Sequence, residues 1–63
     1  MPLFHIRVLR DDRVIREDVL RAPTEERAGA AAQLRYMSCR PGESLVLLRG
    51  GTERARLGPR PNR

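Results

Sequence analysis

The sequence predicts an α+β fold of the order ββαββ, in which a four-stranded antiparallel sheet of two hairpins carries one helix on one face. Apolar and polar residues alternate over residues 3–9, and a segment rich in alanine follows a helix-start signal in the middle of the chain. An aliphatic run at residues 45–48 then leads into a glycine pair. A hydrophobic period that changes from two to 3.6 and back to strand-like runs is typical of this class.

The length of 63 residues allows one small domain, which we expect over residues 1–58, followed by a disordered basic tail over residues 59–63. A core of this size contributes only about 3–5 kcal/mol of net stability. Cys39 is the single cysteine, so an intrachain disulfide is excluded, and no cluster of residues has the spacing of a structural metal site. Association with a second copy is the remaining source of stability, and we expect a homo-oligomer.

The first hairpin is predicted from alternation over residues 3–9, a turn at the two aspartates that follow, and a second strand over residues 13–20. If Leu9 pairs with Val14, Glu17 falls on the apolar face of the first strand. Either a bulge therefore shifts the register of the second strand, or this face is wet at its rim. The residues of the first strand that we expect to face the helix are Phe4, Ile6 and Val8.

The helix is predicted over residues 24–38. Thr24 can accept a hydrogen bond from a free amide of the first turn, and the two glutamates after it suit the positive end of the helix dipole. Gly29 is expected to permit close approach of the helix to the sheet. The apolar stripe expected to face the sheet consists of Ala30, Ala31, Leu34 and Met37.

The second hairpin is predicted from Gly50 and Gly51, which form a two-residue turn. Regular pairing outward from this turn places Val46, Leu48, Ala55 and Leu57 under the helix. The uncovered face would then carry residues of both hairpins, namely His5, Arg7, Leu9, Val14, Arg16, Leu20, Leu45, Leu47, Arg49, Arg54 and Arg56.

This uncovered face is the predicted site, because leucine and valine among arginines are unusual on a solvent face and suit an interface. Replacing Leu47 with glutamate is therefore expected to weaken assembly. The candidates for interface or anion contacts are Arg7, Leu9, Val14, Arg16, Leu45, Leu47, Arg49, Arg54 and Arg56.

No catalytic, metal-binding or phosphate-binding motif includes His5, Cys39 or the glycine pair, so we expect neither enzymatic activity nor a cofactor nor a metal. The sequence predicts a non-enzymatic interaction module, homo-oligomeric, that binds a protein partner through its open sheet face or an edge strand. The net charge of +5 leaves an alternative, a nucleic-acid-binding or regulatory protein that contacts phosphates through arginines. Such binding should be weak and non-specific, because no aromatic side chain of that face can stack on a base.

All 13 basic residues are arginines. This bias fits either a use of guanidinium groups in binding or a GC-rich genome in which arginine codons replace lysine codons. The N-terminus lacks the long apolar region of a signal peptide, and no stretch approaches the length of a membrane span, so we expect a cytoplasmic protein that does not enter the membrane.

Overall fold

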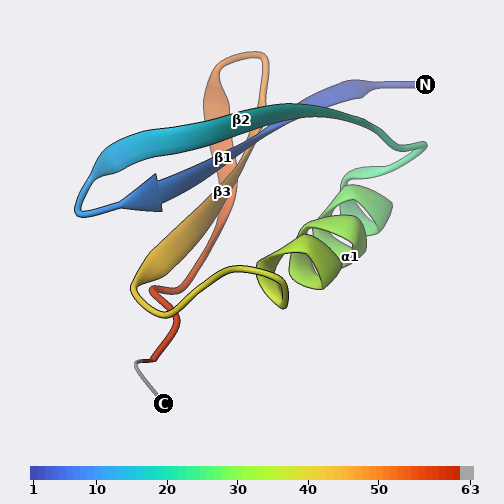
Figure 1. Cartoon of the computed structure of the whole chain (residues 1–63). Coiled ribbons are helices and arrows are strands. Elements are labelled where there is room, and N and C mark those ends of the chain that lie inside the picture. The colour runs from blue at the N-terminus through green and yellow to red at the C-terminus, as the bar shows by residue number, and fades with distance from the viewer. Residues whose placement is uncertain (62–63) are drawn as a thin grey trace.

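A computed structural model of the chain describes residues 1–61. Four strands and one helix follow one another as β1 (Leu3–Arg10), β2 (Arg13–Arg21), α1 (Glu25–Tyr36), β3 (Glu43–Arg49) and β4 (Thr52–Leu57). The strands form one antiparallel sheet in the order β2-β1-β3-β4, and α1 lies on one side of it (Figure 1). The predicted ββαββ fold is confirmed.

Both hairpins close through two-residue turns, as predicted. Asp11 and Asp12 have φ angles of 52° and 64°, and Gly50 and Gly51 have φ angles of 59° and 81°. Two successive residues in the left-handed region form the turn type whose twist matches that of the flanking strands. The glycine pair adopts this conformation without steric cost, whereas the two aspartates adopt it at some cost.

Replacing Asp12 with glycine is expected to raise the free energy of unfolding by up to about 1 kcal/mol, because a residue without a Cβ atom adopts a positive φ more easily. Replacing Asp12 with alanine should lower it, because alanine has the Cβ atom but not the carboxylate that bonds nearby backbone. Urea unfolding of the two variants measures the difference. A glycine variant no more stable than the alanine variant would contradict this account of the turn.

The core lies between α1 and the sheet face that the helix covers. Its largest fully buried side chains are Phe4, Ile6, Leu45 and Leu47. The pairing of β1 with β3 sets Ile6 opposite Leu47, so the two central strands present their apolar residues to the same side. Only small residues of the helix, Ala28 and Ala32, are buried against them.

The second hairpin contains a bulge that the sequence analysis did not foresee. The two residue pairs next to the turn form as predicted, but the register then shifts by one residue at Arg54. Leu47 therefore lies opposite Ala55, and Leu45 lies opposite Leu57. Ala55 and Leu57 belong to the helix side as expected, and the bulge brings the leucines of β3 to the same side.

The prediction that Leu45 and Leu47 lie on the uncovered face is therefore wrong, since each is only 1% exposed in the core. Val46 and Leu48, which were expected under the helix, lie on the opposite face. Four consecutive aliphatic residues carry no alternation, so the sequence of β3 alone does not specify which pair faces the helix.

The first hairpin also contains a bulge, at Ile15. Leu9 pairs with Val14 as predicted, and beyond the bulge Glu17 lies opposite Arg7. Of the two alternatives, the bulge is the one found, and it moves Glu17 away from the apolar side of β1. The same shift moves two residues from the expected uncovered face to the helix side, namely Arg16 and Leu20.

The helix begins as predicted, because the side chain of Thr24 accepts a hydrogen bond of 3.1 Å from the amide of Arg27. The helix is rotated about its axis relative to the prediction. Leu34 and Met37 were expected to face the sheet, but they are 69% and 70% exposed. Large side chains from the strands already fill the space beneath the helix, so the helix turns its alanines toward them.

Candidate interaction surfaces

The first surface is the sheet face turned away from α1, which we call the open face. Residues that pair across neighbouring strands share a face, so the register places them in rows. One row runs from Glu17 through Arg7 and Val46 to Arg56. The next row contains Val19, His5, Leu48 and Glu53.

Val46 and Leu48 form the centre of the open face. They are 4% and 6% exposed, although among the described residues they lie outside the core under the helix. In its row, Val46 has Arg7 on one side and Arg56 on the other. Long arginine side chains can lay their methylene groups over apolar neighbours while the guanidinium group stays in water, so Arg7 and Arg56 are placed to cover Val46.

Two ion pairs lie on the open face, one between β1 and β2 and one within β4. Arg7 donates to the Glu17 carboxylate, and Arg56 donates two hydrogen bonds of 3.0 and 3.1 Å to Glu53. These bonds lower the pKa of Glu17 and of Glu53, and the bond to Glu53 raises the pKa of Arg56. Both carboxylates are therefore charged at neutral pH, and each faces the guanidinium group of its arginine partner.

The lowered pKa values also set the pH range in which these pairs contribute to stability. A carboxylate whose pKa is lower in the folded than in the unfolded chain stabilises the fold above its ordinary pKa, and loses this effect as the pH falls through the folded value. The open face is therefore ion-paired at neutral pH and becomes positively charged in acid.

Other apolar side chains of the open face are exposed on β1 and on the edge strand β2. Val14 and Val19 are about half-exposed, and Leu3 is also exposed. By register, Val14 stands opposite Leu9 and Val19 stands opposite His5. The open face thus combines exposed apolar side chains with two ion pairs, and within each pair the two charges cancel.

The structure divides the candidates of the sequence analysis between the two sides of the sheet. Arg49 stands over the ring of Phe4, 5.6 Å from its centroid, and Arg54 bonds to Glu25 of α1 at 2.7 Å, so both belong to the helix side. The open face retains Arg7, Leu9, Val14 and Arg56, whereas Arg16, Leu45, Leu47, Arg49 and Arg54 lie on the helix side.

Sequence reasoning missed the residues at the centre of the open face. The position of Val46 and Leu48 depends on the bulge at Arg54, for which the sequence offers no specific signal. The pair of Arg7 and Glu17 could have been found, because a bulge in the first hairpin was one of the two alternatives and brings these opposite charges face to face.

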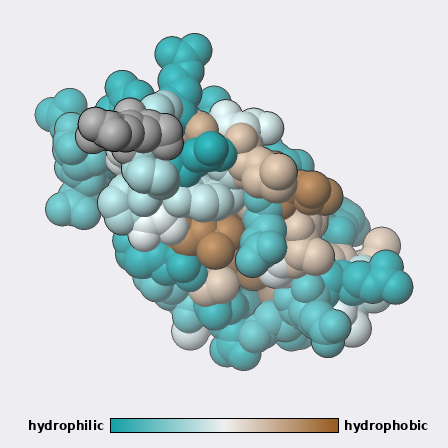
Figure 2. All heavy atoms as spheres, turned by 90° about the horizontal axis from the view of Figure 1, so that it is seen from below, coloured by the Kyte–Doolittle hydropathy of each residue, from teal (hydrophilic) through white to brown (hydrophobic). Residues whose placement is uncertain are grey.

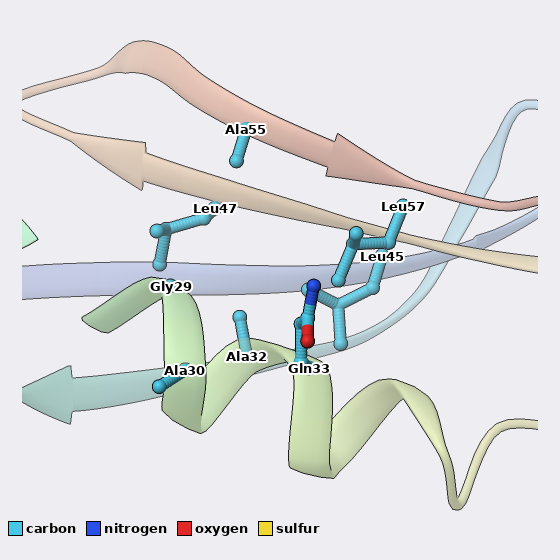
Figure 3. A pocket seen from close by; sticks show the side chains of 8 residues that line it. All are labelled: Gly29, Ala30, Ala32, Gln33, Leu45, Leu47, Ala55 and Leu57. Atoms are coloured by element: carbon cyan, nitrogen blue, oxygen red, sulfur yellow. The ribbon is translucent and has the colours of Figure 1, made fainter. Parts of the chain in front are cut away.

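The second surface is a groove of about 280 Å³ between α1 and the strands β3 and β4. Figure 3 shows the helix contributing short side chains to one wall and the strands contributing aliphatic side chains to the other. Gln33 adds an amide group to the wall formed by the helix. The complete lining is Gly29, Ala30, Ala32, Gln33, Leu45, Leu47, Ala55 and Leu57.

The groove opens on a side of the molecule that has further apolar side chains. Leu34 and Met37 follow Ala30 on α1 at spacings of four and seven residues, which places the three on one stripe of the helix. Figure 2 shows brown and tan apolar residues gathered on this side between teal polar ones. An exposed apolar stripe and an apolar groove therefore lie next to each other.

Arg60 holds the end of the described chain against the helix. Its guanidinium group donates to the carbonyl oxygens of Tyr36 and Met37 at 3.2 and 2.7 Å, and stands 5.6 Å from the centroid of the Tyr36 ring. Its backbone exchanges hydrogen bonds with Gly42 and Glu43. The sequence analysis assigned Arg60 to the tail and expected no packing of it; residues 62 and 63 of that tail lie outside the described part.

Cys39 is buried beside the end of α1. Burial, and next the negative charge of Glu43, raise the pKa of its thiol. The thiol lies 3.7 Å from the carbonyl oxygen of Arg35, to which it can donate. A thiol of this kind stays protonated at neutral pH and is a poor nucleophile.

We expect Cys39 in the folded protein to react with iodoacetamide much more slowly than in the chain unfolded by urea, because reaction needs both exposure and the thiolate. The rate of alkylation followed by mass spectrometry at neutral pH tests this. Equal rates in the two states, with the fold verified by circular dichroism, would contradict the burial of this residue.

Among residues 1–61, no group of three or more histidine, cysteine, aspartate or glutamate side chains is placed to hold a metal ion. Within the same part of the chain, α1 falls short of the length and hydrophobicity needed to cross a membrane. Comparisons of this chain with protein-family models, with curated proteins and with solved structures find no match.

Proposed function

We propose that this chain is a non-enzymatic interaction module that binds a protein partner through the open face of its sheet. The observation that supports the proposal best is the composition of that face. Leu3, Val14 and Val19 are exposed to solvent on this face, whereas Val46 and Leu48 are nearly buried at its centre. Exposed apolar side chains gathered on one face of a small protein are typical of a site of interaction. A cytoplasmic location is part of the same proposal.

The charges of the open face indicate the chemistry of the partner. The chain as a whole has a net charge of +5, whereas the two charges within each ion pair of this face cancel. A partner surface that is apolar where it meets Val14 and Val19, and polar where it meets the two ion pairs, can cover the face without leaving a buried charge unpaired. The pair of Arg7 and Glu17 lies between Val14 and Val19 and therefore falls within the contact.

The edges of the sheet are less suited to binding than its face. Both edge strands, β2 and β4, contain a bulge and several charged side chains. Bulges and charges are the features by which proteins prevent another strand from pairing with an exposed edge. Of the two modes that the sequence analysis considered, the structure therefore favours the open face over an edge strand.

The nucleic-acid alternative receives less support. It requires arginines gathered on one face, but Arg49 and Arg54 belong to the helix side. Arg7 and Arg56 remain on the open face, and each is paired with a glutamate of the same chain. A phosphate would have to compete with these carboxylates, which reduces the gain from counterion release.

Site-specific photo-cross-linking tests the proposal. A photoreactive amino acid is placed at Val19, which is exposed on the open face, and in a matched control at Arg16, which is exposed on the same strand but points to the helix side. Irradiation of cells that express the chain should give a discrete protein adduct from position 19 and not from position 16. Introducing glutamate at Val14, which is exposed on the same face, should abolish the adduct.

Three outcomes would contradict the proposal: no adduct at position 19, equal adducts at both positions, or an adduct sensitive to nuclease. An adduct with the mass of two chains would assign the open face to self-association instead. Mass spectrometry of the purified adduct distinguishes these cases.

A further inference from the structure

We infer that the groove beside α1 is a homodimer interface, in which two helices pack antiparallel and Leu34 of each copy enters the groove of the other. This inference concerns the side of the sheet opposite the open face and does not depend on the function proposed for that face. It accounts for two features that the fold of one chain leaves unexplained, an exposed leucine on a short helix and an unfilled apolar groove next to it.

The groove exists because the helix wall is made of small residues. Gly29, Ala30 and Ala32 supply this wall, and a Cβ atom added at Gly29 would meet nothing within 4 Å beyond its own stretch of helix, so the expected close approach of the helix to the sheet at Gly29 is not found. Unfilled apolar space lowers stability, since its lining lacks contacts on one side. In a domain with so small a core, an aliphatic side chain that enters the groove from outside would recover those contacts.

Leu34 is the side chain suited to this role. It is 69% exposed on α1 and lies one turn beyond Ala30, which lines the groove. When two copies of α1 run antiparallel about a twofold axis at the level of Ala32, Leu34 of one copy stands over Ala30 of the other. The same contact occurs twice, as a twofold interface requires. Each large side chain thus meets a small one.

The charges at the two ends of α1 fit the antiparallel arrangement. The first turn carries Glu25 and Glu26, whereas Arg35 lies in the last turn and Arg40 follows the helix. Within the described residues, Glu25 and Arg35 have ion-pair partners in their own chain. Glu26 and Arg40 remain exposed, and an antiparallel pair brings Glu26 of one copy toward Arg40 of the other, while the two helix dipoles oppose each other favourably.

The size of the interface sets the concentration range of the experiment. A helix of 12 residues is about 18 Å long, so the contact belongs to the small class of interfaces that dissociate readily. We therefore expect a reversible dimer whose apparent mass rises with protein concentration. Such a dimer leaves both open faces free and presents two binding surfaces for the partner proposed above.

Sedimentation velocity over a range of concentrations tests the inference with three variants. L34E introduces a charge at an exposed position, so the monomer should stay folded while the dissociation constant rises about tenfold or more. G29L places a side chain in the groove of its own chain, so it should raise the melting temperature and also prevent dimerisation. V19E, on the open face, is the matched control and should dimerise like the wild type.

Two further measurements keep the outcomes distinct. Circular dichroism verifies that L34E and G29L are folded, and E26R combined with R40E should dimerise better than either single variant. A wild type that is monomeric at the highest concentration would overturn the inference without affecting the cross-link at position 19. A dimer that survives L34E and G29L but is lost in V19E would overturn it and place self-association on the open face.

Discussion

Replacing Leu47 with alanine is expected to lower the free energy of unfolding by about 2–5 kcal/mol, the range measured when a large aliphatic side chain is removed from a core. Leu47 is 1% exposed, pairs with Ile6 across the central strands and lines the groove between α1 and the strands β3 and β4. A domain of this size has little stability to lose. The variant should therefore be largely unfolded at 25 °C, as measured by circular dichroism and urea titration.

The matched control for Leu47 is Val14 on the open face. Val14→Ala removes an exposed apolar side chain at the edge of the sheet and should change the unfolding free energy by no more than about 0.5 kcal/mol. The same reasoning changes the expected effect of glutamate at position 47, which should now unfold the domain rather than dissociate an assembly. A folded Leu47→Glu monomer would show that the described register of β3 is wrong.

Replacing Arg60 with alanine should lower the free energy of unfolding by about 1–2 kcal/mol, because hydrogen bonds from a charged group contribute more than neutral ones. The guanidinium group caps two carbonyl oxygens at the end of α1 and stacks on Tyr36, so one substitution removes three contacts. The positive charge also suits the negative end of the helix dipole. Thermal unfolding gives the magnitude.

Two controls separate this anchoring from a change in net charge. Arg13→Ala removes the same charge from an exposed position in β2 and should leave the melting temperature nearly unchanged. Arg60→Lys keeps the charge but cannot span two carbonyl oxygens with a planar group, so it should fall between wild type and alanine. Equal effects of Arg13→Ala and Arg60→Ala would indicate that only charge matters.

The elements of this fold were predictable because each has a local signal. The turn at Gly50 and Gly51, the cap at Thr24 and the alternation in β1 depend on residues close together in the sequence. The faces were harder to predict. The extra residues at Ile15 and Arg54 shift the register of the two hairpins. Leu34 faces outward because large side chains of the strands fill the core. These outcomes depend on packing between distant segments, which local patterns do not encode.

The candidate site was affected by these shifts more than the fold was. In a half-buried strand, the alternation of apolar and polar residues usually indicates which side is covered. Strand β3 has aliphatic residues on both sides, so its sequence does not indicate the covered side. The extra residue in β4 therefore decided which aliphatic residues of β3 face the helix. Arg7 and Val14 were placed on the correct side because they precede the bulge or pair next to it. The assignment of β3 was reversed, Leu45 and Leu47 included, because the bulge in β4 changes which residues of β3 share a side with Ala55 and Leu57.

The order of strands in the sheet also determines how the chain folds. Each hairpin closes through its own short turn, and only the pairing of β1 with β3 joins segments that are far apart in the sequence. Closing that long loop costs more conformational entropy than closing either turn. The rate-limiting step is therefore expected to be the docking of one preformed hairpin on the other. Substitutions at Ile6, on the shared seam, should slow refolding, whereas substitutions in the distal part of β2 should mainly accelerate unfolding.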